Sequence, residues 1–373
     1  MSGNKRRIPY PRKRAARLLM KILGRVILPL FFKIEISGRE NYPRSGPLLV
    51  VGNHTAAMEA VLLIIYSPWQ IEMLSAADIP AEKITEYVSS GYGVIPLHRG
   101  AYDRAALEAA LGVLDQQGVV GLFPEGGICE ERKKEAHTGI AWLSYRSGAP
   151  VLPIGFNDTT GALHEGLALK RPALKMYVGK LIAAAEIPPA QKRKVFFQQY
   201  ANQVMDAVHE LVPPEDYRSE PEIRDESFQL EISLLDPQGE NIPPPEGLMP
   251  GHPQALAKFL HRPAILKIFR INLDLSIDAL QQLTDLPPTG DILQAARLVL
   301  NYLEEENPHL LTYRFGIQEG LAMQQSLEKL VKLASWAEKR DYQLTLKPIR
   351  HYYSLKKNRS VTQIEQGAFR SWM

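Results

Sequence analysis

The sequence predicts an α/β fold with a mostly parallel central sheet flanked by helices. A basic amphipathic helix is expected before the sheet, and a mainly helical region after it. Three observations lead to this prediction. Basic and apolar side chains alternate with helical period in residues 1–33. Strand-like and helix-like runs alternate over residues 34–215. A proline-rich connector at 216–253 then separates this part from helical patterns in 254–373. The chain has 373 residues, of which 45% are hydrophobic, so it can form buried cores and is not a disordered protein.

The N-terminal segment has an unusual charge. Residues 1–33 carry ten basic side chains and no acid, whereas the remainder carries 34 basic and 41 acidic residues. Arg14, Arg17, Lys21 and Arg25 follow one another at helical spacing and define a basic face. The opposite face is apolar (Leu18, Leu19, Ile22, Leu23, Val26 and Ile27), and Pro29 is expected to end the helix. This pattern favours a helix that lies on an anionic membrane surface, and the alternative is a helix that docks on the rest of the protein.

The second segment reads as a strand–helix alternation. Strands are expected at Leu48–Val51, Ile71–Leu74, Val94–Ile95, Val119–Phe123, Val151–Ile154 and Leu174–Val178. Helices are expected near residues 56–66, 81–90, 103–116, 136–147 and 190–211. Short links between strands and helices are typical of a parallel sheet, so this segment is the predicted α/β domain.

The rest of the chain contains no chemical motif. Residues 242–253 hold five prolines and two glycines, which is typical of a stiff connector. Helical patterns follow near 254–270, 290–305 and 318–339, and a strand is possible at Tyr342–Leu346. The sequence predicts no role for this region.

Several classes of protein are excluded. The single cysteine, Cys129, rules out an intramolecular disulfide and a multi-thiolate metal site, and no Cys/His metal spacing is present. No apolar run reaches the length of a membrane-spanning helix, and there is neither a P-loop nor a dinucleotide fingerprint. The sequence argues against a nucleic-acid partner, because the basic segment offers only Tyr10 for base stacking before Phe31.

Polar residues gather where the predicted strands end, which is where parallel sheets bind ligands. His54 follows the first buried strand, and Glu59 comes five residues later. The carboxylate can fix the tautomer of the imidazole and leave the other ring nitrogen as a general base. The alternative is an ordinary surface pair.

Three further clusters follow later strands. Arg99 is suited to bind a phosphate, Glu125 lies in a Pro-Glu-Gly turn, and Pro153 lies in an apolar run. Each also has a structural interpretation, as a surface charge, a turn residue and an edge-strand residue respectively.

In their order along the chain, these blocks resemble the motifs of the glycerolipid acyltransferase family, which includes the 1-acylglycerol-3-phosphate acyltransferases. The matches are Asn53-His54 with Glu59, then Gly93, Ile95 and Arg99, then Phe123-Pro124-Glu125-Gly126, then Val151, Pro153 and Ile154. The resemblance covers about residues 34–215. It implies the acyltransferase fold and a location at the cytoplasmic face of a membrane, peripheral or monotopic.

The resemblance also implies an activity. His54, oriented by Glu59, takes the proton of an acceptor hydroxyl, which attacks an acyl thioester of coenzyme A or acyl carrier protein. The acceptor is lysophosphatidate or a related lysophospholipid, and no cofactor beyond the thioester is expected. The residues expected to bind substrate are Arg99, Glu125, Gly126, Gly127 and Pro153.

Two positions depart from the family pattern. Glu59 replaces the usual Asp, and Gly127-Ile128 stands where members often have Thr-Arg. Arg132, Lys133 or Lys134 are candidates to supply the basic group. These departures leave a second hypothesis open: a non-catalytic relative that binds lipid or acts as a scaffold at the membrane surface.

Overall fold

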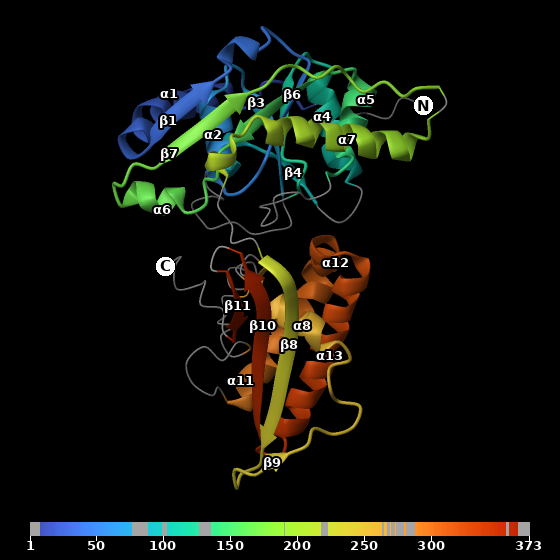
Figure 1. Ribbon diagram of the computed structural model, residues 1–373. Coiled ribbons are helices and arrows are strands. Elements are labelled where there is room, and N and C mark those ends of the chain that lie inside the picture. The colour runs from blue at the N-terminus through green and yellow to red at the C-terminus, as the bar shows by residue number, and fades with distance from the viewer. Residues whose placement is uncertain are drawn as a thin grey trace. The chain divides into compact units, whose positions relative to one another are not determined.

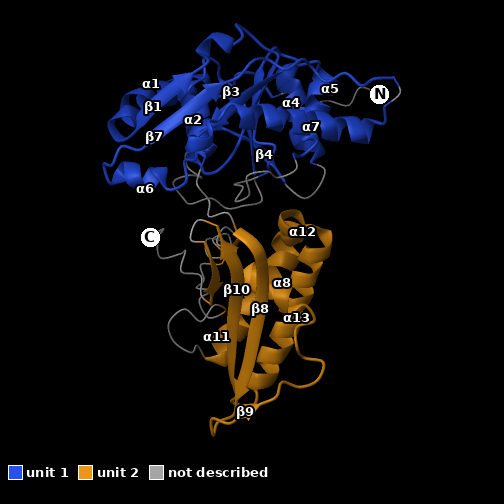
Figure 2. Ribbon diagram, viewed as in Figure 1, with its two compact units in different colours: residues 1–77, 83–98, 102–218 blue, residues 78–82, 99–101, 219–373 orange. Residues whose placement is uncertain are grey.

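The computed structural model describes residues 8–76, 89–98, 103–126, 136–189, 191–217, 223–262, 288–355 and 358–364, with five single residues between 262 and 288. Its described residues up to 217 form one compact unit, and those from 223 onward form a second (Figure 2). The first unit contains the predicted α/β domain together with the N-terminal helix. The predicted α/β fold class is therefore confirmed.

A seven-stranded sheet forms the centre of the first unit, in the order β1-β7-β6-β2-β5-β3-β4 (Figure 1). The five strands from β6 to β4 run parallel, β7 is antiparallel to β6, and β1 is parallel to β7. The strands are β1 (Lys33–Ser37), β2 (Leu48–Gly52), β3 (Ile71–Ala76), β4 (Ile95–Leu97), β5 (Val119–Leu122), β6 (Val151–Phe156) and β7 (Ala173–Val178).

Helices cover both faces of this sheet. Every residue of β2 is buried, and alternate residues serve two different cores. Leu49 and Val51 pack with α4 (Arg104–Leu114), α5 (Gly139–Ser147) and α7 (Arg193–Glu210). Leu48 and Val50 pack with the other core, which includes α2 (Met58–Tyr66) and α6 (Ala162–Leu167). Burial on both faces explains why β2 reads as a continuous apolar run.

The predicted helices near 56–66, 103–116, 136–147 and 190–211 are confirmed by α2, α4, α5 and α7. Most of the predicted helix near 81–90 lies outside the described residues. Short 3-10 turns at Arg39–Asn41 and Pro214–Asp216 complete the unit.

The N-terminal helix α1 (Arg14–Phe31) docks on the domain through its basic face. Arg17 is fully buried, and its two terminal nitrogens bond the Glu72 carboxylate at 2.6 and 2.7 Å. The ammonium of Lys21 bonds the carbonyl oxygens of Ser67 and Trp69, and Arg25 bonds that of Ile65. Burial, with help from Arg25 and Arg17, lowers the pKa of Lys21 to about 8.

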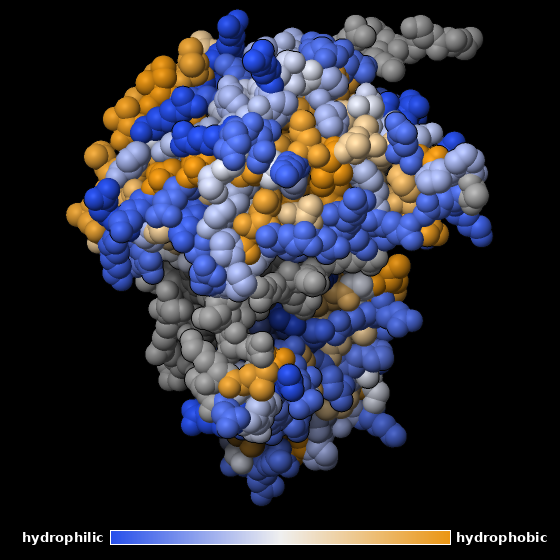
Figure 3. Space-filling view, turned by 45° about the horizontal axis from the view of Figure 1, so that its top comes forward, coloured by the Kyte–Doolittle hydropathy of each residue, from blue (hydrophilic) through white to orange (hydrophobic). Residues whose placement is uncertain are grey.

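The apolar face of α1 is the exposed one. Its large side chains are 46–64% exposed: Leu18, Leu19, Ile22, Leu23, Val26, Ile27 and Leu30. They form part of the hydrophobic surface in Figure 3. The prediction that the basic stripe faces an anionic membrane is therefore wrong for Arg17, Lys21 and Arg25, which bond the domain instead. The helix also continues past Pro29 to Phe31, so Pro29 does not end it.

The second unit is an antiparallel sheet with helices packed against it. The strand order is β11-β10-β8-β9, with β8 (Ile223–Leu235), β9 (Asn241–Ile242), β10 (Gln343–Ser354) and β11 (Arg359–Gln363). The helices are α8 (Pro253–Leu260), α11 (Thr289–Asn301), α12 (Leu310–Phe315) and α13 (Ile317–Glu338), with a π-helical turn at Tyr302–Glu306. Leu230 and Leu234 of β8 and Leu344 and Leu346 of β10 contribute to one core with these helices.

This unit differs from the prediction in two ways. Residues 216–253 were expected to be a connector, yet β8 lies within them and pairs with β10 along most of its length. The possible strand at Tyr342–Leu346 extends to Ser354. Long, paired strands therefore accompany the predicted helices.

Within the described residues, no helix combines the length and the apolar character needed to cross a membrane. The same residues contain no group of three or more His, Cys, Asp or Glu side chains arranged to hold a metal ion.

A buried histidine makes the second unit sensitive to acid. Burial lowers the pKa of His261 from 6.5 to about 4. The positive charges of Arg350 and Arg262 also lower this pKa, whereas the hydrogen bond with the Pro348 carbonyl and the charge of Glu226 raise it. Between these two pH values the unfolded chain binds a proton that the folded chain does not, so stability falls as pH falls.

We therefore predict that the free energy of unfolding of the second unit decreases by about 3 kcal/mol as pH falls from 6.5 to about 4. Denaturant unfolding across this range measures the effect. His261→Phe should flatten the profile, and His309→Ala, which removes an exposed histidine, should not. Identical profiles for the wild type and His261→Phe would contradict the assignment.

Candidate active site

Two of the predicted motifs meet at one edge of the sheet. Strand β2 lies between β5 and β6 and runs parallel to both. His54 follows the end of β2, and Glu125 follows the end of β5. Parallel strands place these residues at the same edge, as the sequence predicts.

Asn53 joins the ends of β2 and β6. Its side-chain amide donates to the Phe156 carbonyl at 2.9 Å, and its side-chain oxygen accepts from the Phe156 N–H at 2.7 Å. Asn53 is buried, so both bonds satisfy groups that water does not reach. The amide side chain thereby continues the ladder between the strands and fixes the start of the loop that carries His54.

The His54–Glu59 pair predicted from sequence is present. The imidazole Nδ1 lies 3.3 Å from Glu59 Oε2, and Glu59 is fully buried on the first turn of α2. When Nδ1 carries a proton and donates to the carboxylate, Nε2 holds the free lone pair. The His54 side chain is 18% exposed, so it is partly open to solvent. This geometry suits a general base.

The Glu59 carboxylate is held by more than the histidine. The N–H of Ala56 lies 3.0 Å from both of its oxygens. The hydroxyls of Thr55 and Thr159 donate to Oε1. Thr159 comes from the segment after β6, 100 residues away in sequence, so sequence spacing gave no signal of it. A buried carboxylate held by several donors is strongly oriented, so the long Glu59 side chain is fixed in its position beside His54.

An aromatic ring fixes the plane of the imidazole. Phe123 stacks on His54 with ring centroids 4.3 Å apart and an interplanar angle of 11°. Gly52 permits this arrangement, because a Cβ atom there would meet the rings of Phe156 at 2.7 Å and Phe123 at 3.2 Å. The Phe of the Phe-Pro-Glu-Gly block therefore contacts the candidate base directly.

Glu125 contacts two histidines. Its Oε2 accepts from the backbone N–H of His54 at 3.0 Å, and its Oε1 lies 3.4 Å from Nε2 of His209. The Glu125 side chain is 7% exposed. His209, near the end of α7, was missed by sequence reasoning because it lies far along the chain in a helix without a motif. In this structure Glu125 helps to position the loop of His54.

Gly126 closes the turn after Glu125. Its φ of +73° lies in the left-handed region, and its N–H bonds the Phe123 carbonyl at 3.1 Å. Glycine occupies this conformation without steric cost.

Pro153 does not lie at the end of its strand. It is buried in the middle of β6, opposite Val51, and its carbonyl accepts from the Gly179 N–H at 2.9 Å. Since β6 lies between β7 and β2, the edge-strand interpretation of Pro153 is wrong. Its surroundings indicate a packing role, and its expected part in substrate binding remains a prediction.

Other predicted residues lie outside the described part of the chain: Arg99, Gly127, Cys129, Arg132, Lys133 and Lys134. The preceding strand β4 is present and pairs with β3 at the edge of the sheet. His98, next to Arg99, forms a pair with Asp103 at 3.0 Å and is 69% exposed.

Residues 33–157 match the model of the family described as Acyltransferase. A 1-acyl-sn-glycerol-3-phosphate acyltransferase of Borreliella burgdorferi is 27% identical over 134 residues, covering 34% of this chain and 52% of the relative. A chloroplastic 1-acyl-sn-glycerol-3-phosphate acyltransferase of Arabidopsis thaliana is 26% identical over 162 residues, covering 42% and 45%. The chain therefore spans about half the length of these relatives.

A solved structure, the 1-acyl-sn-glycerophosphate acyltransferase PlsC of Thermotoga maritima, aligns with a TM-score of 0.40 at 17% identity, covering 53% of this chain and 83% of that one. The family match and the curated relatives show that residues 33–157, within the first unit, are similar to the Acyltransferase family. Both curated relatives to which this segment is similar are 1-acyl-sn-glycerol-3-phosphate acyltransferases.

The Thr159 hydroxyl offers a test of how Glu59 is held. Thr159→Val keeps the shape of the side chain and removes one donor to a buried carboxylate, so the unfolding free energy should fall by about 1.5–3 kcal/mol. Denaturant unfolding of the first unit measures this change. Thr160→Val is the matched control in the neighbouring position. Equal stability of the two variants would show that the hydroxyl does not support Glu59.

Proposed function

We propose that the protein transfers a fatty acyl group from an acyl thioester of coenzyme A or acyl carrier protein to the hydroxyl of lysophosphatidate or a related lysophospholipid. The observation that carries this proposal is the His54–Glu59 pair at the sheet edge of a domain that matches the acyltransferase family. The acceptors named for the two curated relatives, both 1-acylglycerol-3-phosphate acyltransferases, support the choice of substrate.

In the proposed reaction, His54 Nε2 takes the proton of the acceptor hydroxyl while the oxygen attacks the thioester carbonyl carbon. The carbon–sulfur bond then breaks, and the leaving thiolate takes the proton from His54. Glu59 holds Nδ1 throughout and stabilises the imidazolium that forms between the two steps. A general base of this kind accelerates a reaction by about 10²–10⁴-fold.

We assign the remaining roles by chemistry. Phe123 and Glu125 position His54 through the ring stack and the backbone hydrogen bond. Arg99, which lies outside the described residues, is proposed to bind the phosphate of the acceptor. Glu125 and Gly126 are proposed to help hold the acceptor, together with the adjacent Gly127. No metal ion or other cofactor is part of this mechanism.

The contacts of Glu59 favour catalysis over the non-catalytic alternative. Burying a carboxylate is costly unless donors surround it, and Glu59 has donors from His54, Thr55 and Ala56, which precede α2, and from the segment after β6. A site released from its catalytic role has no need to keep this arrangement. The longer side chain is therefore interpreted as an accommodated substitution.

We predict that His54→Ala lowers acyl transfer at least 100-fold, because one general base is typically worth that much. Thiol release from acyl-coenzyme A or acyl carrier protein, with a panel of lysophospholipids as acceptors, measures the rate. His309→Ala, an exposed histidine of the second unit, serves as the control.

Glu59→Asp should also reduce the rate, since the shorter side chain cannot reach His54 and Thr159 together. Turnover of His54→Ala within about tenfold of wild type would contradict the general-base role. If the wild type transfers no acyl group with any donor and acceptor, the lipid-binding alternative is the better description.

We further propose that the protein works on the cytoplasmic face of a membrane and is attached through the exposed apolar face of α1. The proposed lysophospholipid acceptor and the product reside in a bilayer, and the exposed side chains of α1 supply an apolar surface of the kind that inserts at a membrane interface. Because Arg17, Lys21 and Arg25 bond the domain, apolar insertion contributes more to attachment than the basic stripe does.

We predict that Leu19→Asp and Val26→Asp each weaken co-sedimentation with phosphatidylcholine vesicles at least tenfold, because each places a charge at the apolar interface. Ile317→Asp, which alters an apolar residue 73% exposed in the second unit, is the matched control. Point variants are preferable to deletion of residues 1–33, which would leave Glu72 buried without Arg17. Wild-type binding by both α1 variants would exclude this face from attachment.

A further inference from the structure

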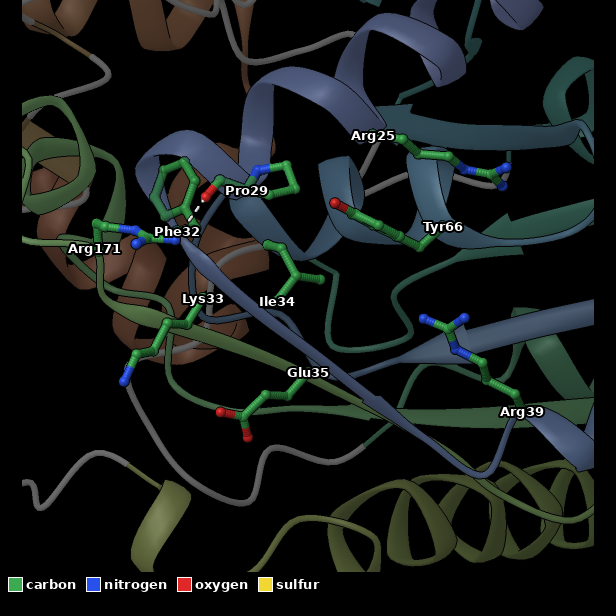
Figure 4. Close-up of a pocket in the computed structure, with 9 residues that line it drawn as sticks. All are labelled: Arg25, Pro29, Phe32, Lys33, Ile34, Glu35, Arg39, Tyr66 and Arg171. Atoms are coloured by element: carbon green, nitrogen blue, oxygen red, sulfur yellow. Dashed lines mark hydrogen bonds between the residues drawn. The ribbon is translucent and has the colours of Figure 1, made fainter.

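A pocket that none of the proposed catalytic residues lines lies between the C-terminal end of α1 and strand β1 (Figure 4). Its volume is about 490 Å³. None of the motif residues lines it. The lining residues are Arg25, Pro29, Phe32, Lys33, Ile34, Glu35, Arg39, Tyr66 and Arg171.

The pocket is strongly basic, with four cationic side chains against the single carboxylate of Glu35. Two of the cations are held by the protein: Arg25 bonds the Ile65 carbonyl at 3.0 Å, and Arg171 bonds the Pro29 carbonyl at 2.9 Å. Within the described part of the chain, Lys33 and Arg39 have no ion-pair partner. The local charge therefore favours an anionic ligand.

Tyr66 adds an unsatisfied polar group beside these cations. Its hydroxyl is buried and has no hydrogen-bond partner among the described residues. Burial raises the pKa of Tyr66, whereas Arg25 and Arg39 lower it, so both guanidinium groups lie within electrostatic reach of the hydroxyl. Figure 4 shows Tyr66 and Arg39 extending toward Ile34 at the middle of the pocket.

The pocket borders the apolar surface of the first unit. Leu30, at the end of α1, is 64% exposed, and Leu167 and Leu169, at the end of α6, are 67% and 70% exposed. Phe32, directly after α1, packs closely on Gly166 of α6, since a Cβ atom on Gly166 would lie 2.4 Å from the Phe32 ring. This contact joins the two helices. A basic pocket thus lies at the margin of apolar side chains contributed by two helices.

We propose that this pocket binds the phosphate of an anionic phospholipid in the membrane on which α1 rests. Phosphate oxygens would accept hydrogen bonds from Arg39 and the Tyr66 hydroxyl, which extend into the pocket in Figure 4. Lys33 and Arg171 at its rim would add positive charge, and the acyl chains would extend toward the apolar margin. An anionic headgroup without a separate positive charge matches the pocket best. The inference rests on the proposed membrane attachment and adds to it a selectivity for lipid charge.

The test uses the full chain with Lys33→Gln and Arg39→Gln combined, because neither side chain is needed to hold α1. Co-sedimentation compares vesicles of phosphatidylcholine alone with vesicles that also contain phosphatidylglycerol. The wild type should bind the anionic vesicles at least tenfold more tightly, and the variant should lose this preference while binding phosphatidylcholine vesicles as before. Arg297→Gln with Lys332→Gln, an equal change of charge on exposed residues of the second unit, should retain the preference.

The possible outcomes separate this inference from the attachment on which it rests. Equal binding of the wild type to both kinds of vesicle, or an unchanged preference in the Lys33/Arg39 variant, overturns the lipid site but leaves attachment intact. An equal loss in the control variant assigns the preference to net charge and also overturns the site. Failure of the wild type to bind any vesicle overturns both. Displacement from anionic vesicles by inorganic phosphate, well beyond that caused by chloride at equal ionic strength, would assign the pocket to a soluble anion instead.

Discussion

The buried carboxylate of Glu72 determines how the N-terminal helix faces. Glu72 and Arg17 both have fully buried side chains, and Arg12 adds a further bond at 2.8 Å. Burial raises the pKa of Glu72, but the bonds from Arg17 and Arg12 outweigh it and leave the pKa below its usual value. Removing one partner of a buried pair costs about 3–5 kcal/mol, so the basic face of α1 has to turn inward. The exposed apolar face, and the membrane attachment we infer from it, follow from this pair.

At the sheet edge that holds the proposed active site, three polar residues connect the loop of His54 to separate parts of the chain. Asn53 ties it to β6, Glu59 ties it to α2 and to Thr159, and Glu125 ties it to the turn after β5. These side chains are buried and hydrogen-bonded, so the imidazole has little freedom to leave its position. Such prior ordering is what a general base requires, because the reacting groups then need no rearrangement during the reaction.

Much of this arrangement could be predicted from sequence, because it depends on the order of strands and helices along the chain and on short separations between residues. The ends of parallel strands had to meet, and a Glu five residues after His54 was within reach of the ring. Helical periodicity separated the two faces of α1 but could not say which one is buried. The signal that was missed is Glu72, an acid within the apolar run Ile71–Leu74.

The partners contributed by Thr159 and His209 depend on tertiary packing, which spacing along the chain does not encode. In the second unit, by contrast, a local signal was available. Phe228, Leu230, Ile232 and Leu234 alternate with polar residues and all pack with one core, yet the nearby prolines led to a connector being predicted.

Helix α1 is bonded to the domain at more places than the Arg17–Glu72 ion pair. Arg17 also bonds the carbonyl oxygens of Tyr92 and Gly93 at 2.9 and 3.1 Å, just before β4. A domain fastened to a bilayer through this helix has little freedom to tilt. It would meet its acceptor by diffusion in two dimensions, with its orientation already set.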